Sequence, residues 1–231
     1  MKSVTVIQHT SAEYLGLIED HFEGRRIRFQ YFRPFTEQGR VPGMKSVGDG
    51  LVLLGGGPWG SGGQRNVPSL IEEVELTFEC LKLGIPIVGI GLGAQIIALA
   101  SGGQTVETPL AFNVGYATRC EDDALNGYLP VRYPLVEYMR DRPVPPKSAK
   151  ILAVNEQGDA ALFQIADNVF GFSGHPGVKV AMAEDLIMEF EESPVDASER
   201  LDSLKLKKTE IEDALVPIMT GLVQLTGLMR E

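Results

Sequence analysis

Two glycine-rich turns, each joined to a short apolar run, constrain the fold of this chain more than any other sequence feature. The run 51–54 leads into the first turn, Gly55–Gly63, and the run 86–90 overlaps the second, Gly89–Gly93. Apolar runs without polar alternation are typical of parallel strands that are buried on both faces. Because ligands bind at the carboxyl ends of such strands, we expect the two turns to border one binding site.

Segments with helical periodicity separate the apolar runs. The spacing predicts helices over 12–22, 67–83 and 94–100, and strands over 4–7 and 27–32, with shorter strands between 105 and 174. In the second helix, the glutamates of the run 72–75 are assigned to solvated faces. The last fifth is again helical, and Pro217 should kink or interrupt its final helix. The pattern predicts an α/β fold with a mainly parallel central sheet flanked by helices.

Composition excludes several classes of partner and site. The 21 Lys and Arg against 31 Asp and Glu leave a net charge of −10, which disfavours nucleic acid and anionic membranes. Two cysteines, Cys80 and Cys120, are typical of a reduced cytoplasmic protein, and the N-terminus resembles neither a signal peptide nor a membrane span. Three dispersed histidines without metal-ligand spacing predict no metal site, and we expect no cofactor.

The turn at 89–95 fits two motifs. Read literally, Gly89-Ile90-Gly91-Leu92-Gly93-Ala94 matches G-x-G-x-x-G/A, with Glu107 near the distance for a ribose-binding acid in a dinucleotide site. That fingerprint usually lies in the first strand–helix unit of a chain, whereas here several strands precede it. The longer stretch Pro86–Gln95 instead has the form of a nucleophile elbow, a tight strand-to-helix turn with glycines on either side of its apex.

The elbow and three further segments resemble the class I glutamine amidotransferases. That family carries P-x-x-G-[IV]-C-x-G-x-Q at the elbow, a G-G-P loop, E-I-G-[WY] and G-x-Q-F-H-P-E. The corresponding segments of this chain are 86–95, Gly55-Gly56-Gly57-Pro58, Asn113-Val114-Gly115-Tyr116 and Gly171-Phe172-Ser173-Gly174-His175-Pro176. The resemblance implies a flavodoxin-like fold over residues 1–190, followed by a helical extension over 191–231.

The resemblance also implies which residues form the site and which are missing. In active members the elbow Cys attacks the glutamine amide, a His acts as its base and a Glu two residues later orients that His. Here the Cys position is Gly91 and the Glu position is Gly177, while His175 remains. Gly57 and Leu92 are the implied oxyanion-hole donors. The implied substrate-binding residues are Gly56, Gln95, Asn113, Val114 and Gly115.

Loss of the attacking atom leads us to expect an amidotransferase-like protein without glutaminase activity. We expect a binding, structural or regulatory subunit of an amide-transfer or ligase system, which retains a pocket for glutamine or a related small amide or carboxylate. An alternative is an enzyme that uses His175 as a base in different chemistry at the same cleft. The C-terminal helices either pack on the domain or present an apolar stripe, Ile211, Leu215, Ile218, Leu222 and Leu225, to a partner or a second copy.

Overall fold

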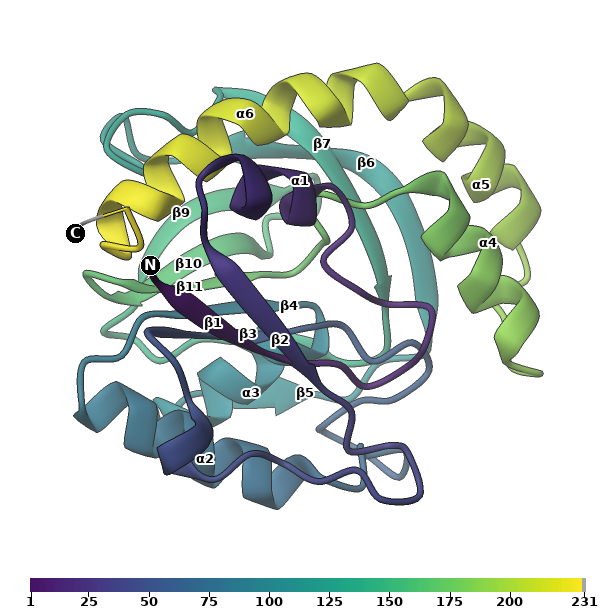
Figure 1. The fold of residues 1–231 in the computed structure, drawn as a ribbon. Helices are drawn as coiled ribbons and strands as arrows, with labels where there is room; N and C mark the ends of the chain where they lie inside the picture. Colours follow the sequence, from purple (N-terminus) through teal and green to yellow (C-terminus); the bar gives the residue numbers. More distant parts are fainter. Residues whose placement is uncertain (230–231) are drawn as a thin grey trace.

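One large sheet organises the computed structural model, which describes residues 1–229 of the chain (Figure 1). Within these residues the sheet has nine strands, in the order β2-β1-β3-β4-β11-β10-β9-β6-β7. The strands are β1 (Ser3–Ile7), β2 (Arg28–Phe32), β3 (Gly50–Leu53), β4 (Ile87–Ile90), β6 (Ala111–Arg119), β7 (Arg132–Met139), β9 (Lys150–Asn155), β10 (Ala160–Ala166) and β11 (Val169–Phe172). A small antiparallel pair, β5 (Gln104–Val106) and β8 (Arg142–Val144), lies beside it.

The sheet changes direction at β11. Strands β2, β1, β3, β4 and β11 are parallel to one another, whereas β10, β9, β6 and β7 continue the sheet in antiparallel pairs. The turn after β3 and the turn after β4 therefore emerge at the same edge, because β3 pairs with β4 in parallel register. The α/β class with a mainly parallel sheet around the candidate site is confirmed.

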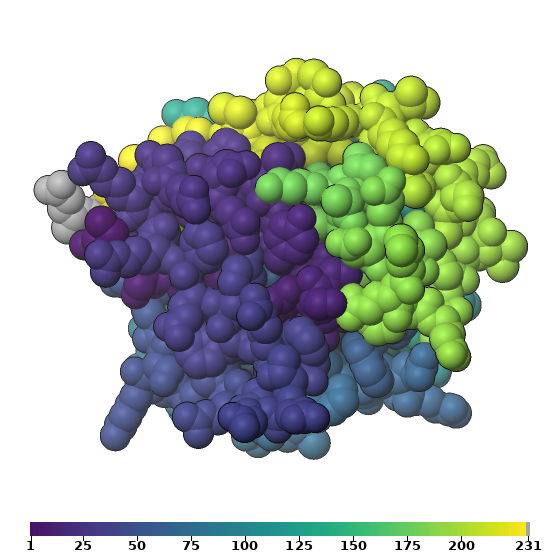
Figure 2. All heavy atoms as spheres, turned by 45° about the vertical axis from the view of Figure 1, so that its right-hand side comes forward, coloured from purple at the N-terminus to yellow at the C-terminus, as the bar shows by residue number. Residues whose placement is uncertain are grey.

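Helices cover both faces of the parallel strands. Helices α2 (Leu70–Lys82) and α3 (Leu92–Ala100) lie on one side, together with the short 3₁₀ helix η1 (Met44–Ser46), and α1 (Leu17–Gly24) and α6 (Lys208–Leu225) lie on the other (Figure 1). Helices α4 (Val180–Glu189) and α5 (Ala197–Leu206) connect β11 to α6. In Figure 2 the green α4 segment lies against the purple N-terminal part of the chain. Among the described helices, none combines the length and the apolarity needed to cross a bilayer.

The first helix begins later than the sequence pattern predicts. Residues 12–16 are not helical, and α1 starts at Leu17, after Gly16 with φ 61°. The Glu13 N–H donates to the Thr10 hydroxyl, and the Leu17 N–H donates to Gly177 O at 2.8 Å. The first bond is local, whereas the second gives the Leu17 N–H a partner outside the helix and brings residues 13–17 against the turn that follows β11.

Strand β7 contains Pro134, a residue expected from the sequence to separate strands. The proline pairs with Tyr116 of β6, and β7 lies at the end of the strand order. An edge strand tolerates proline because the missing N–H belongs to the side that has no neighbour.

The C-terminal helices pack on the domain. Helix α6 continues through Pro217, so the expected interruption of this helix does not occur. Four members of the apolar stripe, Ile211, Leu215, Ile218 and Leu222, are buried within the chain itself. Over residues 191–229 this packing agrees with the first of the two expectations for the extension, and those four side chains are not available to a second copy; residues 230–231 lie outside the described part of the chain.

The burial of one face of α6 predicts that substitutions at two adjacent positions differ sharply in their effect on the free energy of unfolding. Leu215 is 0% exposed and Val216 is 53% exposed. We expect Leu215→Ala to lower the free energy of unfolding by about 2–5 kcal/mol, because it leaves a cavity in the core. Val216→Ala should change it by less than about 0.5 kcal/mol. Urea unfolding followed by circular dichroism measures both, and similar losses in the two variants would contradict the packing of α6.

Candidate functional site

Gly91 forms the apex of a nucleophile elbow between β4 and α3. Its backbone has φ 55° and ψ −111°, and its N–H donates to Phe172 O at 2.8 Å. A positive φ of this kind favours glycine. A side-chain carbon on Gly91 would lie 3.5 Å from the Gly55 Cα atom and 3.9 Å from Ser173 O, so the apex has room for a side chain that the chain does not supply. By contrast, a side chain on Gly93 would collide with Leu53 of β3.

A small cavity lies in front of the elbow. Its volume is about 20 Å³, which is room for a water molecule and far less than glutamine requires. It brings together the apex of the elbow and His175, as the sequence predicts. The lining includes Glu13, Gly91, Phe112, Tyr138, Ser173, His175, Met182 and Leu186.

Both ring nitrogens of His175 are engaged by the backbone. The Gly177 N–H donates to Nδ1 at 3.1 Å, so Nε2 carries the proton and donates to Tyr14 O at 2.8 Å. Burial lowers the pKa of His175 to about 4, against a smaller opposing effect of the bond to Tyr14. The imidazole is therefore neutral at pH 7, and neither nitrogen has a lone pair free to accept a proton.

Gly177 is enclosed far more tightly than Gly91. A side-chain carbon there would lie 3.0 Å from Ile18 Cγ1 of α1 and 3.3 Å from Leu215 Cδ2 of α6. The backbone N–H of Gly177 orients the ring of His175 from this position. Helices α1 and α6 occupy the volume that a longer side chain would need.

The two implied oxyanion donors differ in their surroundings. Leu92 opens α3, where backbone N–H groups have no partner inside the helix. The Gly57 N–H donates to the Glu13 carboxyl group, and a side-chain carbon on Gly57 would lie 3.1 Å from Phe190 and 3.2 Å from Leu186. The end of α4 and the residue that follows it therefore close the pocket above Gly57.

Glu13 is the site residue that the sequence reasoning did not identify. Its carboxyl group is buried beside Gly55, where any side chain would collide with it. Burial raises the pKa of Glu13 to about 7, although the bond from Gly57 and the nearby His9 lower it. The helical prediction over 12–22 concealed this residue. Thr10 before it and Gly16 after it are the signals that mark the irregular segment.

A buried ion pair supports the first glycine-rich turn from below. His9 follows β1, and its Nδ1 donates to Gly55 O at 3.0 Å while Nε2 contacts the Glu73 carboxylate at 2.8 Å. Both side chains of the pair are 0% exposed. The assignment of Glu73 to a solvated helix face is therefore wrong, because α2 turns this residue toward the sheet, where His9 neutralises its charge. Burial alone would lower the pKa of His9, but the Glu73 carboxylate raises it above 6.5.

Gln95 and Gly56 hold the turns in place. The Gln95 side chain accepts from the Ser61 hydroxyl at 2.6 Å and donates to Arg140 O at 2.8 Å, so both ends of its amide are occupied. The missing side chain of Gly56 leaves room for Leu92, which packs closely against it.

None of the three candidate residues of β6 lines the cavity in front of the elbow. Phe112 lines the cavity in front of Gly91, while Asn113 lines a separate polar pocket of about 180 Å³ together with Glu137 and Asp159. Neither Val114 nor Gly115 lines the elbow cavity, and Val114 packs in the hydrophobic cluster around Phe112. The structure thus brings Gly91 and His175 together in one cavity, with Gly57 bonded to Glu13 in its lining, whereas Asn113 lines a neighbouring pocket that shares Ser173 with it.

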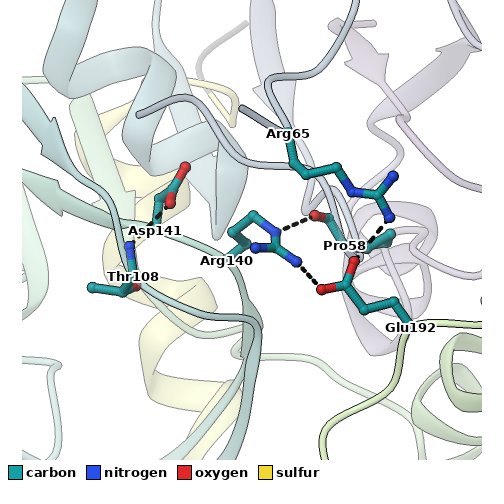
Figure 3. A network of polar contacts seen from close by, with 6 residues as sticks. All are labelled: Pro58, Arg65, Thr108, Arg140, Asp141 and Glu192. Carbon is teal, nitrogen blue, oxygen red and sulfur yellow. Dashed lines mark hydrogen bonds and ion pairs between the residues drawn. The ribbon is translucent and has the colours of Figure 1, made fainter. Parts of the chain in front are cut away.

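A polar network joins the G-G-P loop to β7 and to the segment after α4 (Figure 3). Arg140 donates from Nε to Pro58 O at 2.8 Å and also contacts Glu192. Arg65 donates to the same carboxylate at 2.8 Å. The adjacent Asp141 accepts from the Thr108 N–H at 3.1 Å, and further N–H groups of Ser61 and Gly62 donate to its other oxygen.

Other nucleophiles and ligands do not complete a site. Cys80 is buried in the cluster under α2, and Cys120 is exposed after β6. The Ser173 hydroxyl donates to the carboxyl group of Glu137 at 2.5 Å. Burial raises the pKa of Glu137. Within residues 1–229, no group of three or more His, Cys, Asp or Glu side chains has an arrangement suited to a metal ion.

Comparison with known proteins identifies the family. The family model described as "Glutamine amidotransferase class-I" matches residues 15–190. The chain belongs to this family. The dinucleotide interpretation of the 89–94 turn is therefore set aside, and the elbow is that of a class I amidotransferase fold.

Two curated relatives agree with this assignment, and a solved structure shares the fold. The chain is 29% identical over 169 residues to a glutamine-hydrolyzing GMP synthase of Aeropyrum pernix, a match that covers 69% of this chain and 31% of the relative. A carbamoyl phosphate synthase small chain of Photobacterium profundum is 40% identical over 67 residues, which are 29% of this chain and 17% of that one. The chain thus spans about a third or less of either relative. A glutamine amidotransferase structure from Methylobacillus flagellatus has the same fold, with a TM-score of 0.83, 20% identity and coverage of 97% of this chain and 95% of the other.

The His9–Glu73 pair predicts a pH-dependent loss on substitution. A raised pKa of His9 contributes stability that is fully present below its ordinary value of 6.5 and is lost as the pH rises through the raised value. We expect Glu73→Gln to lower the free energy of unfolding by about 3 kcal/mol at pH 6, because it leaves a buried charge unpaired. The loss should be smaller at pH 9. Exposed Glu72→Gln on the same helix is the control and should be silent at both pH values. Equal losses at pH 6 and pH 9 would contradict a charged His9.

Gly91 and Gly177, which occupy the positions of the family's Cys and Glu, should differ in how well they tolerate a side chain. Gly91→Cys should fold and lose about 1–3 kcal/mol, because only the positive φ opposes it. Gly177→Glu should lose more than about 3 kcal/mol, since it collides with α1 and α6 and buries a charge. Gly24→Glu is the control, because nothing lies within 4 Å of the side-chain position at the end of α1. Thermal and urea unfolding rank the three variants, and a Gly177→Glu protein as stable as the Gly24→Glu protein would refute the crowding at Gly177.

Proposed function

We propose that this chain is a class I amidotransferase-like subunit that does not hydrolyse glutamine. The single observation that carries the proposal is Gly91 at the apex of a formed elbow, where the resemblance implies the attacking Cys. Glycine supplies no nucleophile, and loss of a nucleophile in a comparable hydrolytic site reduces kcat by about 10⁶-fold.

The surroundings of the elbow support the same proposal. A base must offer a lone pair to the proton it removes, and both nitrogens of His175 are already bonded to the backbone. The donor at Gly57 is bonded to Glu13, and the cavity is too small for glutamine in this conformation. The alternative of an enzyme with His175 as base would require the ring to leave both of these bonds, so the geometry favours the binding or regulatory role.

The chemistry of the relatives suggests where such a subunit acts. One relative is a synthase that hydrolyses glutamine, and another is the small chain of a carbamoyl phosphate synthase. We therefore propose a synthetase or ligase partner, to which this chain contributes binding or regulation in place of ammonia. The ligand of its pocket would be glutamine or a related small amide or carboxylate, admitted when the end of α4 moves away from Gly57.

The proposal predicts no ammonia release from glutamine. The purified protein and its His175→Ala variant should both match a buffer blank in a coupled glutamate dehydrogenase assay, because neither contains an attacking atom. Cys80→Ser and Cys120→Ser serve as controls for an unexpected thiol reaction. Ammonia release that is catalytic and that falls when His175 is replaced would refute the proposal and would favour the enzyme alternative.

A further inference from the structure

The carboxyl group of Glu13 lies inside the candidate pocket and is itself bonded there. Glu13 lines the cavity in front of Gly91 and is only 5% exposed. Its Oε2 accepts a hydrogen bond from the Gly57 N–H. Gly57 is the donor that the resemblance assigns to a developing negative oxygen. A side chain of this protein therefore already supplies the kind of atom that this amide would receive from a ligand.

The backbone around Glu13 is arranged to hold it in this position. The Glu13 N–H donates to the Thr10 hydroxyl at 3.1 Å, and the next residue, Tyr14, accepts from His175 Nε2 at 2.8 Å. The positive φ of Gly16 ends the irregular segment, and the Leu17 N–H bonds to Gly177 O. Two consecutive residues, 13 and 14, thus occupy the Gly57 amide and the His175 ring at the same time.

Glycines provide the space for the carboxyl group. A side chain on Gly55 would overlap with both oxygens of Glu13, so the first glycine of the G-G-P loop is required for this contact. On the opposite side, Leu186 and Phe190 cover Gly57. The carboxyl group is enclosed between the loop and α4 and is not exchanged for a solvent molecule without movement of one of them.

We propose that Glu13 is an internal ligand that blocks the pocket: its carboxyl group takes the Gly57 amide that the oxygen of a small carboxylate ligand would otherwise accept. The contact is autoinhibitory, and the pocket becomes available when Glu13 is displaced. This inference rests on the proposed binding role, because it specifies how that pocket is regulated and which ligand chemistry it selects.

The charges around Glu13 set the pH range in which the block changes. Those that face it are His9 after β1, Glu189 on α4, the neutral His175 after β11 and the Tyr138 hydroxyl on β7, and Glu73 of α2 acts through His9. With the pKa of Glu13 at about 7, both of its charge states are populated near neutral pH. An ionised carboxylate accepts a stronger hydrogen bond than its neutral form. The block is therefore strongest above neutral pH and weaker below it.

Binding of acetate to a truncated site tests the proposal without reference to glutamine hydrolysis. Wild-type protein and Glu13→Ala are titrated with sodium acetate at constant ionic strength, and the Gly57 amide is followed by ¹H–¹⁵N NMR. We expect acetate to shift this amide in Glu13→Ala with an affinity at least about tenfold above that of the wild type, because the vacated donor regains an acceptor. Glu191→Ala, which removes an exposed charge from the segment after α4, should behave as the wild type. Equal responses in wild type and Glu13→Ala, including no response in either, would overturn the proposal.

A second measurement does not depend on the folding of Glu13→Ala. In the wild type the Gly57 amide resonance should shift between pH 5 and pH 9 as Glu13 ionises, and in the isosteric Glu13→Gln the shift should be much smaller, because only His9 then titrates beside the loop. A Gly57 resonance that is independent of pH in the wild type, or that titrates equally in Glu13→Gln, would overturn the proposal. Because neither experiment uses glutamine or measures ammonia release, their failure leaves the absence of glutaminase activity unaffected, and the reverse also holds.

Discussion

The close approach of residues 13–17 to the turn at 175–177 is the contact on which the site depends. Its bonds run from His175 to Tyr14 O and from Leu17 to Gly177 O, and Gly177 lies tightly between α1 and α6. The bond to Tyr14 O fixes the tautomer of His175. The bond from the Leu17 N–H to Gly177 O coincides with the start of α1 at Leu17, and it leaves Glu13 in the irregular segment that enters the pocket. It also explains why α6 belongs to the site although it follows the family region, since Leu215 packs on the turn from outside.

Electrostatics under the pocket are unusual for an acidic α/β domain. Three ionisable side chains are buried beside the G-G-P loop: His9 and Glu13 are bonded to its backbone, and Glu73 is bonded to His9. The pair His9 and Glu73 is neutral as a unit, because one charge compensates the other. Glu13 lacks such a full partner, so burial raises its pKa and it keeps a proton to about neutral pH. The G-G-P loop is therefore bonded at Gly55 to the buried His9–Glu73 ion pair and at Gly57 to the titratable carboxyl group of Glu13.

The glycine-rich turns could be predicted from sequence because steric rules act locally. The elbow needs a positive φ at Gly91 and a close approach to β3 at Gly93, and both requirements are visible as glycines after an apolar run. The parallel strands that carry the turns were predictable for the same reason. The burial of Glu73 and the non-helical path through Glu13 were not, because they depend on which partner the fold brings near. Periodicity also missed β7, since Pro134 is tolerated only because that strand lies at the edge of the sheet.

Arg140 is bonded to two parts of the chain that are distant in sequence. It holds Pro58 O in the G-G-P loop and Glu192 after α4, and Glu192 is held a second time by Arg65 (Figure 3). The loop and the segment after α4 cannot shift relative to each other without breaking one of these bonds. The Glu192 side chain is partly exposed. Arg140 therefore joins the backbone of the G-G-P loop to a carboxylate at the surface of the protein. Binding of a cation or a partner at Glu192 would therefore be felt at Pro58, because the Arg140 guanidinium group contacts both residues.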